Sequence, residues 1–244
     1  MMLQNRVALV TGGAKRVGQA IALALAARHA HVVITYRASL RETRETLKTL
    51  QRSDPDAMAV RADLSRNADV TRLMERIAGR FGRLDVLINS AANFERVPFS
   101  ALSERAWDRA IDTNLKGPFL CALYASRLMR RHGGGKIINL ADWAGVRPYR
   151  DYLPYCVSKA GVIGLTTALA KELAPAIQVT AVAPGPILPP PGMGRAARAR
   201  VAARVPLKRW GSPQDIVNTV LFLIEGTDFM TGSTVFVDGG QLIA

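Results

Sequence analysis

A tyrosine and a lysine stand four residues apart in the stretch DYLPYCVSKAG, at Tyr155 and Lys159. Residues at this spacing share one face of a helix, which would bring the lysine ammonium close to the phenol. A cation about 4 Å away, at an effective dielectric near 20, lowers the pKa of a phenol by roughly three units from about 10. We therefore predict that Tyr155 donates a proton near neutral pH. Tyr149 and Tyr152 have no lysine four residues further on and are poor substitutes.

An aspartate, Asp142, precedes this tyrosine in the stretch INLADWAG. An ionised carboxylate repels the negative charge that develops on a ketone oxygen during reduction, which would slow that reaction. It accepts hydrogen bonds from the N–H groups of a nitrogen heterocycle, and together with Tyr155 it can deliver a proton to a ring nitrogen. We therefore predict that Asp142 favours reduction of C=N over C=O. The alternative is that Asp142 only accepts hydrogen bonds from backbone N–H groups.

These side chains need a scaffold, and the sequence predicts one of alternating strands and helices. Short runs rich in Val and Ile are nearly continuous, which is typical of strands buried on both faces. The alternation predicts an α/β fold over residues 1–244: a single-domain, Rossmann-like, doubly wound fold with a seven-stranded parallel sheet flanked by helices. The expected strands are 6–12, 31–36, 57–63, 84–89, 135–141, 177–183 and 233–239, and the expected helices are 14–28, 40–52, 66–80, 103–131, 155–173 and 213–225.

A glycine-rich turn lies between the first expected strand and the first expected helix, in VALVTGGAKRVGQA. Gly12 and Gly13 allow a tight turn, and Gly18 lets the helix lie close to the strand. The helix N-terminus can hold a pyrophosphate through its free N–H groups and its dipole. In this strand–turn–helix context the glycines predict a dinucleotide site.

The end of the second expected strand, TYRASLR, indicates which dinucleotide binds. An NAD site usually has an acid here for the ribose 2′-hydroxyl, but the first acid is Glu42, inside the next helix. Arg37, Ser39 and Arg16 are instead placed for the 2′-phosphate of NADP, and the planar arginine fork suits phosphate. We therefore predict NADPH/NADP+ as the cofactor. The alternative is that these arginines are solvated surface residues.

Several motifs agree in their order along the chain: TGGAKRVG (11–18), AD (62–63), NSAA (89–92), DTN (112–114), Tyr155-x-x-x-Lys159, PG (184–185) and VDGG (237–240). In this order they resemble the short-chain dehydrogenase/reductase family over nearly the whole chain. The resemblance implies that Tyr155 is the proton donor, Lys159 binds the nicotinamide ribose and Asn114 anchors a water relay. The residues expected at the cofactor are Gly12, Lys15, Arg16, Val17, Gly18, Tyr36, Arg37, Ser39, Asp63 (near the adenine), Leu64, Asn89, Ala91, Ala92, Tyr155, Lys159, Pro184, Gly185 and Ile187.

A finer resemblance rests on Arg16, Arg37, Asp142 and the pair NF at 93–94. Together they resemble the pteridine reductases and dihydromonapterin reductases within that family, whose other members usually have Ser where Asp142 stands. This resemblance implies that Phe94 stacks on a pterin ring opposite the nicotinamide. It also implies that Asp142 and Tyr155 bind the same substrate.

Two departures set this chain apart from the families that it resembles. Ala92 matches a serine that contacts the pterin in that subgroup, so one polar contact is missing. After PG (184–185) the family usually has a Thr or Ser, whereas Pro186-Ile187-Leu188 leaves only backbone groups beside the nicotinamide amide.

The stretch 184–210 begins with prolines and glycines and continues as an Arg/Ala segment, and we predict a substrate loop or lid there. The alternative is a merely exposed connection.

The composition of the chain limits the kinds of partner, cofactor and compartment that we expect for it. The net charge of +14 favours acidic partners, but the basic residues are spread along the chain and aromatic residues make up only 6%, so we expect no nucleic acid. The apolar runs are too short to span a bilayer, and no export signal precedes the first strand, so we expect no membrane and a cytoplasmic location. Two cysteines without metal-ligand spacing predict no metal site. The family resemblance implies a homotetramer, in which helices 103–131 and 155–173 meet their symmetry mates.

Three functions of different kinds remain open. The first is an NADPH-dependent pteridine reductase that transfers hydride to a dihydropterin or biopterin-like small molecule. The second is a 3-oxoacyl-(acyl-carrier-protein) reductase or other NADPH-dependent ketone reductase, for which the basic residues Arg195, Arg198, Arg200 and Arg204 would attract an acidic carrier. The third is a non-catalytic cofactor sensor, which the intact Tyr155/Lys159 pair does not favour. The sequence alone leaves the physiological substrate open, folate included.

Overall fold

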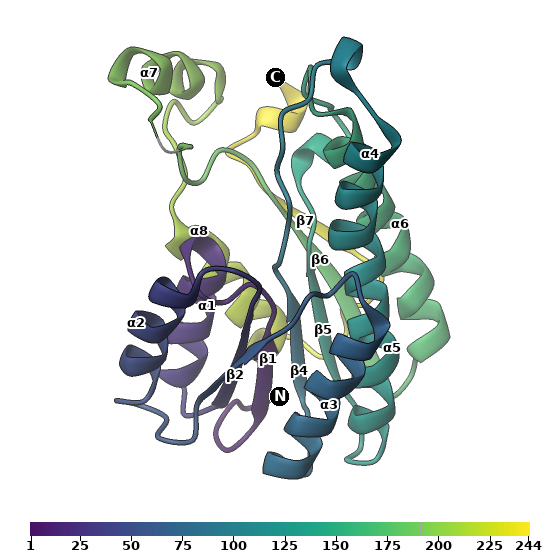
Figure 1. Ribbon diagram of the computed structural model, residues 1–244. Coiled ribbons are helices and arrows are strands. Elements are labelled where there is room, and N and C mark those ends of the chain that lie inside the picture. Colours follow the sequence, from purple (N-terminus) through teal and green to yellow (C-terminus); the bar gives the residue numbers. More distant parts are fainter. Residues whose placement is uncertain (191) are drawn as a thin grey trace.

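The computed structural model describes residues 1–190 and 192–244 and is built around one sheet of seven parallel strands (Figure 1). Their order is β3-β2-β1-β4-β5-β6-β7. The predicted seven-stranded parallel sheet flanked by helices is confirmed, and each observed strand lies within an expected one except β6, which ends one residue later, at Pro184. The strands are β1 (Val7–Val10), β2 (His31–Tyr36), β3 (Met58–Arg61), β4 (Val86–Asn89), β5 (Gly135–Leu140), β6 (Ile177–Pro184) and β7 (Thr234–Val237).

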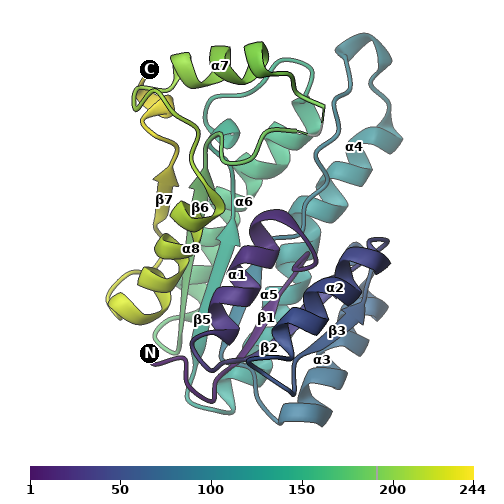
Figure 2. The ribbon, with the colours of Figure 1, turned by 90° about the vertical axis from the view of Figure 1, so that its left-hand side faces the viewer.

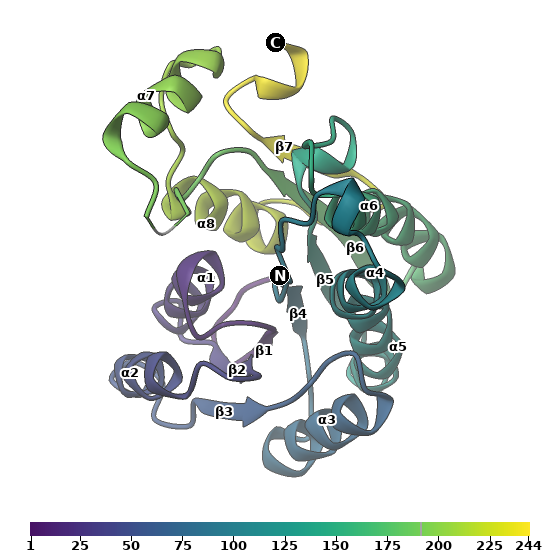
Figure 3. The same ribbon diagram turned by 45° about the horizontal axis from the view of Figure 1, so that its top comes forward.

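The central strands are buried because helices cover both faces of the sheet. Figure 3 shows α1 (Arg16–Ala26), α2 (Leu40–Leu50) and α8 (Pro213–Leu221) on one face, and α3 (Asn67–Phe81), α4 (Glu104–Ile111), α5 (Gly117–Arg130) and α6 (Leu153–Leu173) on the other. Alternate residues of β1 serve the two cores: Ala8 and Val10 belong to the first, Val7 and Leu9 to the second. Leu9 is paired with Val33 on one side and Leu87 on the other.

The helix expected over 103–131 is not continuous. It consists of α4 and α5 joined by a π-helical turn at Asp112–Lys116. A π turn holds one extra residue, and such turns are frequent at functional sites. Asn114 lies in this turn and is buried, which places its side chain against the loop that follows β4.

The segment after β6 leaves the sheet and returns to it. Within it, α7 (Arg195–Arg204) has no buried residue and stands away from the other helices (Figure 2). The structure therefore forms a helix where the sequence indicated only an Arg/Ala stretch in a predicted lid. Ile187 and Val205, at the two ends of this excursion, are buried, so the segment is fixed to the body of the protein on both sides.

Helix α6 is the one helix among the described residues that is long and apolar enough to cross a bilayer by length and composition. Of its most apolar stretch 44% is buried in the fold, where the helix lies against the sheet and carries Tyr155 and Lys159. A core helix of a globular protein passes the same test. Within residues 1–190 and 192–244, no group of three or more His, Cys, Asp and Glu side chains is placed to hold a metal ion.

Candidate active site

The glycine-rich turn after β1 forms a close-fitting cradle at the carboxyl end of the sheet. Gly12 has φ +64°, and a Cβ on it would lie 2.8 Å from the Cα of Ala91. A Cβ on Gly18 would lie 2.6 Å from the Gly12 carbonyl oxygen. The Thr11 hydroxyl accepts hydrogen bonds from the N–H groups of Ser90 (2.9 Å) and Ala91 (3.1 Å), which joins this turn to the end of β4. This cradle fits a dinucleotide pyrophosphate at the N-terminus of α1.

Arg16, the first residue of α1, makes a contact that the sequence did not indicate. Its guanidinium donates a 3.1 Å hydrogen bond to the carbonyl of Leu188, at the start of the 184–210 segment. Its φ of +56° is in the left-handed region, which is unusual for a residue other than glycine. Lys15 beside it is exposed, and Val17 packs against the core. The turn and the predicted lid are therefore linked directly.

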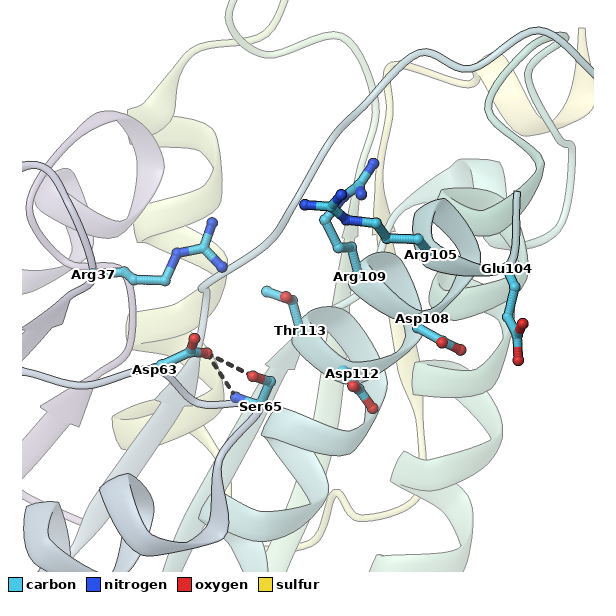
Figure 4. Close-up of a pocket in the computed structure, with 9 residues that line it drawn as sticks. All are labelled: Arg37, Asp63, Ser65, Glu104, Arg105, Asp108, Arg109, Asp112 and Thr113. Atoms are coloured by element: carbon cyan, nitrogen blue, oxygen red, sulfur yellow. Dashed lines mark hydrogen bonds between the residues drawn. The ribbon is translucent and has the colours of Figure 1, made fainter. Parts of the chain in front are cut away.

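A pocket of about 380 Å³ lies beyond the end of β2, between this strand and α4 (Figure 4). Arg37 points into it from one side, and Arg105 and Arg109 lie across from it. Asp63 is at its floor, where the carboxylate accepts hydrogen bonds from Ser65. The remaining lining residues are Glu104, Asp108, Asp112 and Thr113. This is the position expected for the adenosine end of the cofactor.

The other residues expected at the cofactor lie at the ends of four strands, β2, β3, β4 and β6. Tyr36 and Ser39 flank Arg37, and Ser39 is the N-cap residue of α2 without a side-chain capping bond. Asn89 is buried at the end of β4, and its Nδ2 donates to Asn139 Oδ1 at 2.9 Å. The remaining members of the set are Leu64 (buried, after β3), Ala92 (exposed, after β4), Pro184 (the last residue of β6), Gly185 (against Asp238) and Ile187 (in the core).

The Tyr155 hydroxyl binds Asp142 rather than Lys159. It donates a 2.6 Å hydrogen bond to Asp142 Oδ2, while Oδ1 of the same carboxylate accepts the Ala144 N–H at 2.8 Å. Burial raises the pKa of Tyr155 well above its usual value, and the charge of Asp142 raises it further. The prediction of a lowered Tyr155 pKa is therefore wrong in this structure. The reason is that Tyr155 is deeply buried next to an acid.

The surroundings of Asp142 also shift the pKa of its carboxyl. Burial raises its pKa, although the hydrogen bonds from Tyr155 and Ala144 and the charge of Lys159 act in the opposite direction. The reading that Asp142 only accepts backbone donors is incomplete, because one oxygen takes the backbone N–H and the other takes the phenol. Asp142 and Tyr155 therefore form one coupled acid pair.

Lys159 lies one turn further along α6 and is buried. Its ammonium donates a 2.5 Å hydrogen bond to the Leu140 carbonyl at the end of β5. It lies 5.8 Å from the centre of the Tyr155 ring, so the two residues share a helix face as predicted. Burial lowers the pKa of Lys159 to about 8. A cation held in this position can bind a ribose hydroxyl and keep the phenol oriented.

The buried side chain of Asn114 is fully engaged. Its Oδ1 accepts the Asn93 N–H at 2.6 Å, and its Nδ2 donates to the Asn93 carbonyl at 2.9 Å and to Ser158 Oγ at 3.0 Å. The side chain thus fixes the residue next to Phe94. Both hydrogens of Nδ2 are used in these bonds, so the Asn114 side chain has none left to donate to a water.

Aromatic rings surround the acid pair. Phe94 is half exposed, stacks on Tyr152 with ring centres 4.5 Å apart, and meets the edge of Tyr155 at 4.7 Å. Tyr149 accepts a hydrogen bond from the Trp143 indole, and burial raises the pKa of Tyr149. Sequence reasoning dismissed Tyr149 and Tyr152 as substitutes for Tyr155 and so missed them as walls of the site. The signal that would have placed them together is the recurrence of tyrosine every three residues, at Tyr149, Tyr152 and Tyr155.

Known proteins match this chain over nearly its whole length. Residues 12–241 match the family model described as enoyl-(acyl carrier protein) reductase. A 3-oxoacyl-(acyl-carrier-protein) reductase from Staphylococcus epidermidis is 35% identical over 241 residues, covering 97% of this chain and 99% of that protein. One from Synechocystis is 36% identical over 246 residues, covering 99% and 98%.

A solved structure from Sinorhizobium meliloti 1021, described as a candidate short-chain alcohol dehydrogenase, is also similar. It has a TM-score of 0.93 and 33% identity over 100% of both chains. The two curated relatives carry the name of the second activity kept open above. They do not support the finer resemblance to pteridine reductases.

Proposed function

Because the chain belongs to the short-chain dehydrogenase/reductase family, we propose that it is an NADPH-dependent reductase in which Tyr155 protonates the reduced substrate. The observation that carries this proposal is that Tyr155 and Lys159 share one face of α6, with Lys159 Nζ 5.8 Å from the centre of the Tyr155 ring. The bound cofactor would supply a hydride. The whole chain is proposed to act as one catalytic domain.

The residues of the chain supply binding, orientation and a proton. The glycine turn and the N-terminus of α1 would hold the pyrophosphate, and Arg37 with Ser39 would hold the 2′-phosphate. Lys159 would hold the nicotinamide ribose through the ammonium that binds the Leu140 carbonyl. The Tyr155 hydroxyl, which is buried among aromatic rings, would then donate the proton.

The names of the relatives support a 3-oxoacyl thioester as one substrate class. The arginines of α7 are consistent with an acidic carrier, because all four are exposed and the helix contains no acid. Among the residues that the structure describes, none of them pairs with a carboxylate. For a ketone, Asp142 would act in its protonated form and donate a hydrogen bond to the carbonyl oxygen, as a serine would.

One observation favours a second substrate class, a pterin or related nitrogen heterocycle. Asp142 binds the Tyr155 hydroxyl and lies among aromatic rings, one of which is the half-exposed Phe94. An ionised carboxylate accepts ring and amino N–H groups, and aromatic faces stack on planar rings. In this case the substrate would be reduced at a C=N bond and would take its proton from Tyr155.

We also propose a homotetramer in the cytoplasm. Two free, buried cysteines, Cys121 and Cys156, are consistent with a reducing compartment. Burial raises the pKa of the Cys121 thiol to about 12, so this thiol is unreactive at neutral pH.

The test is a panel of substrates with the purified protein. Oxidation of NADPH and of NADH would be followed with dihydrobiopterin, dihydrofolate, acetoacetyl coenzyme A and acetoacetyl-(acyl carrier protein). A preference for either acetoacetyl thioester would assign the 3-oxoacyl thioesters as the substrate class. A preference for dihydrobiopterin or dihydrofolate would assign the pterins. No oxidation of either cofactor with any of them would contradict the proposed function.

A further inference from the structure

The loop that carries Phe94 is held at its first residue by a pair of hydrogen bonds. The backbone N–H and carbonyl of Asn93 both bind the amide of Asn114, at 2.6 and 2.9 Å. The next residue after Phe94, Glu95, forms an ion pair with Arg109 on α4. These contacts join the loop to α4 and to the π turn that follows α4.

A second attachment joins the same loop to the start of α6. Arg96 donates a 2.6 Å hydrogen bond to the carboxylate of Asp151, and the Val97 N–H donates to the carbonyl of Asp151 at 2.8 Å. Asp151 thus binds two successive residues of the loop, Arg96 through its carboxylate and Val97 through its backbone carbonyl. Asp151 has φ +68°, in the left-handed region that aspartate and asparagine tolerate better than most residues.

These contacts bracket the two rings that stack on each other. Phe94 lies two residues before Arg96, and Tyr152 directly follows Asp151. Their ring planes are inclined by 13° with centres 4.5 Å apart, although half of Phe94 is exposed. The Asp151 attachment therefore fixes both backbones from which the stacked rings extend.

We infer that Arg96 and Asp151 are positioning residues that hold Phe94 stacked on Tyr152, and that they thereby fix the exposed part of the Phe94 ring and make the site selective for a planar ring over a flexible acyl chain. The inference rests on the proposed reductase function and concerns which substrates it accepts. A planar ring needs a ring face at a fixed distance and tilt, whereas an acyl chain adapts to a displaced side chain. Neither residue touches the reacting atoms.

The experiment compares four single variants with the unmodified protein. Asp151→Asn keeps the left-handed backbone preference and removes the charge, and Arg96→Gln removes the other partner. Arg96→Lys is the conservative variant that should restore part of the effect. Arg80→Gln is the matched control, because Arg80 also forms an exposed ion pair, with Asp56, on another part of the surface.

Two measurements are made on each variant: hydrogen exchange of the amides of residues 93–97, and KM and kcat for dihydrobiopterin and acetoacetyl coenzyme A. Faster exchange at Val97 is expected in Asp151→Asn and Arg96→Gln, with KM for the pterin raised about threefold to tenfold. The kcat values and the KM for the acetoacetyl thioester should stay within about twofold. Arg80→Gln should change neither measurement.

Equal changes in KM for the two substrates would overturn the inference. Faster amide exchange that leaves the ratio of the two KM values unchanged would also overturn it. If the unmodified protein turns over neither substrate, the proposed function fails, and equilibrium dialysis of dihydrobiopterin then decides the inference separately. Weaker binding in Asp151→Asn than in Arg80→Gln would support it. Equal binding in the two variants, or no binding to the unmodified protein, would overturn it.

Discussion

The Tyr155 hydroxyl donates its hydrogen bond to Asp142 Oδ2, at 2.6 Å, and not to a solvent-exposed group. The acid therefore has more influence on the phenol than the lysine four residues away. Burial and the Asp142 charge both raise the pKa of Tyr155, so this residue holds its proton at neutral pH until a stronger base forms beside it. A reduced substrate nitrogen or oxygen is such a base.

Replacement of this acid should separate the two substrate classes. Asp142→Ser removes the charge that raises the Tyr155 pKa, so the pH profile of kcat should move to lower pH. Pterin reduction should lose most of its rate, because the acceptor of ring N–H groups is gone. Reduction of a simple ketone should be retained or increased. Steady-state kinetics with both substrates from pH 5 to pH 9 checks this, and unchanged pterin turnover would contradict it.

Removal of the phenolic proton should abolish both activities. Tyr155→Phe is expected to lower kcat by about 10²–10⁴-fold, or roughly 3–5 kcal/mol, which is the usual contribution of one proton-transfer group. Cofactor affinity, measured by fluorescence titration, should change little. Tyr149→Phe is the control, because the Tyr149 hydroxyl lies beside the same Asp142 carboxyl but also accepts the Trp143 indole N–H. Similar losses in the two variants would show that Tyr155 is not the donor.

The coenzyme preference should depend on Arg37. Hydrogen bonds to a charged group contribute roughly 1.5–3 kcal/mol, so Arg37→Asp should weaken NADPH binding about 10- to 100-fold. The new carboxylate should also bind the ribose 2′-hydroxyl of NADH and reverse the preference. Arg44→Asp, on the exposed side of α2, is the control for the change in net charge. Equal affinity of the unmodified protein for the two cofactors would refute the prediction.

The buried Lys159 should make stability depend on pH. Its pKa is lowered from 10.5 to about 8 by burial, so between these values the unfolded chain binds more protons than the folded chain. The free energy of unfolding should therefore rise with pH across this window, relative to Lys159→Met. Urea unfolding of both proteins at pH 7, 8, 9 and 10 measures the difference. A constant difference would mean that the folded lysine titrates normally.

The association state is expected to be a tetramer held partly by the outer face of α4, α5 and α6. These helices lie on one side of the sheet (Figure 3) and expose the apolar side chains of Trp107, Phe119 and Val157. Burial of such a face stabilises an assembly by about 25 cal/mol per Å² of apolar surface. Phe119→Glu should shift sedimentation toward smaller species. A monomer at micromolar concentration in the unmodified protein would contradict the prediction.

The sequence was most informative where one physical pattern dominates. The strands were found because Val- and Ile-rich runs such as 84–89 are buried on both faces, and the glycine turn because Gly12 and Gly18 have no room for a Cβ. The π turn at Asp112–Lys116 was missed, because one extra residue scarcely disturbs the apolar periodicity over 103–131.

Contacts between distant segments were not predictable in the same way. The spacing of Tyr155 and Lys159 indicated a shared helix face, but the phenol's actual partner depends on how η3, the turn at Trp143–Gly145, brings Asp142 back toward α6. The bond from Arg16 to Leu188 and the attachment of Val97 to Asp151 depend on loop paths. Neither loop has a periodic pattern that would reveal its course.

The adjacency of β1 and β4 in the sheet has an evolutionary consequence. Chain connections run outward from this pair in opposite directions, so Arg37 and Asp63 are carried by one half of the sheet, and Phe94, Asp142 and Tyr155 by the other. The side chains expected to select the coenzyme and those expected to contact the substrate therefore lie on separate segments of the chain. A lineage with this architecture can thus exchange one coenzyme for another, or one substrate for another, through independent mutations that need not arise together.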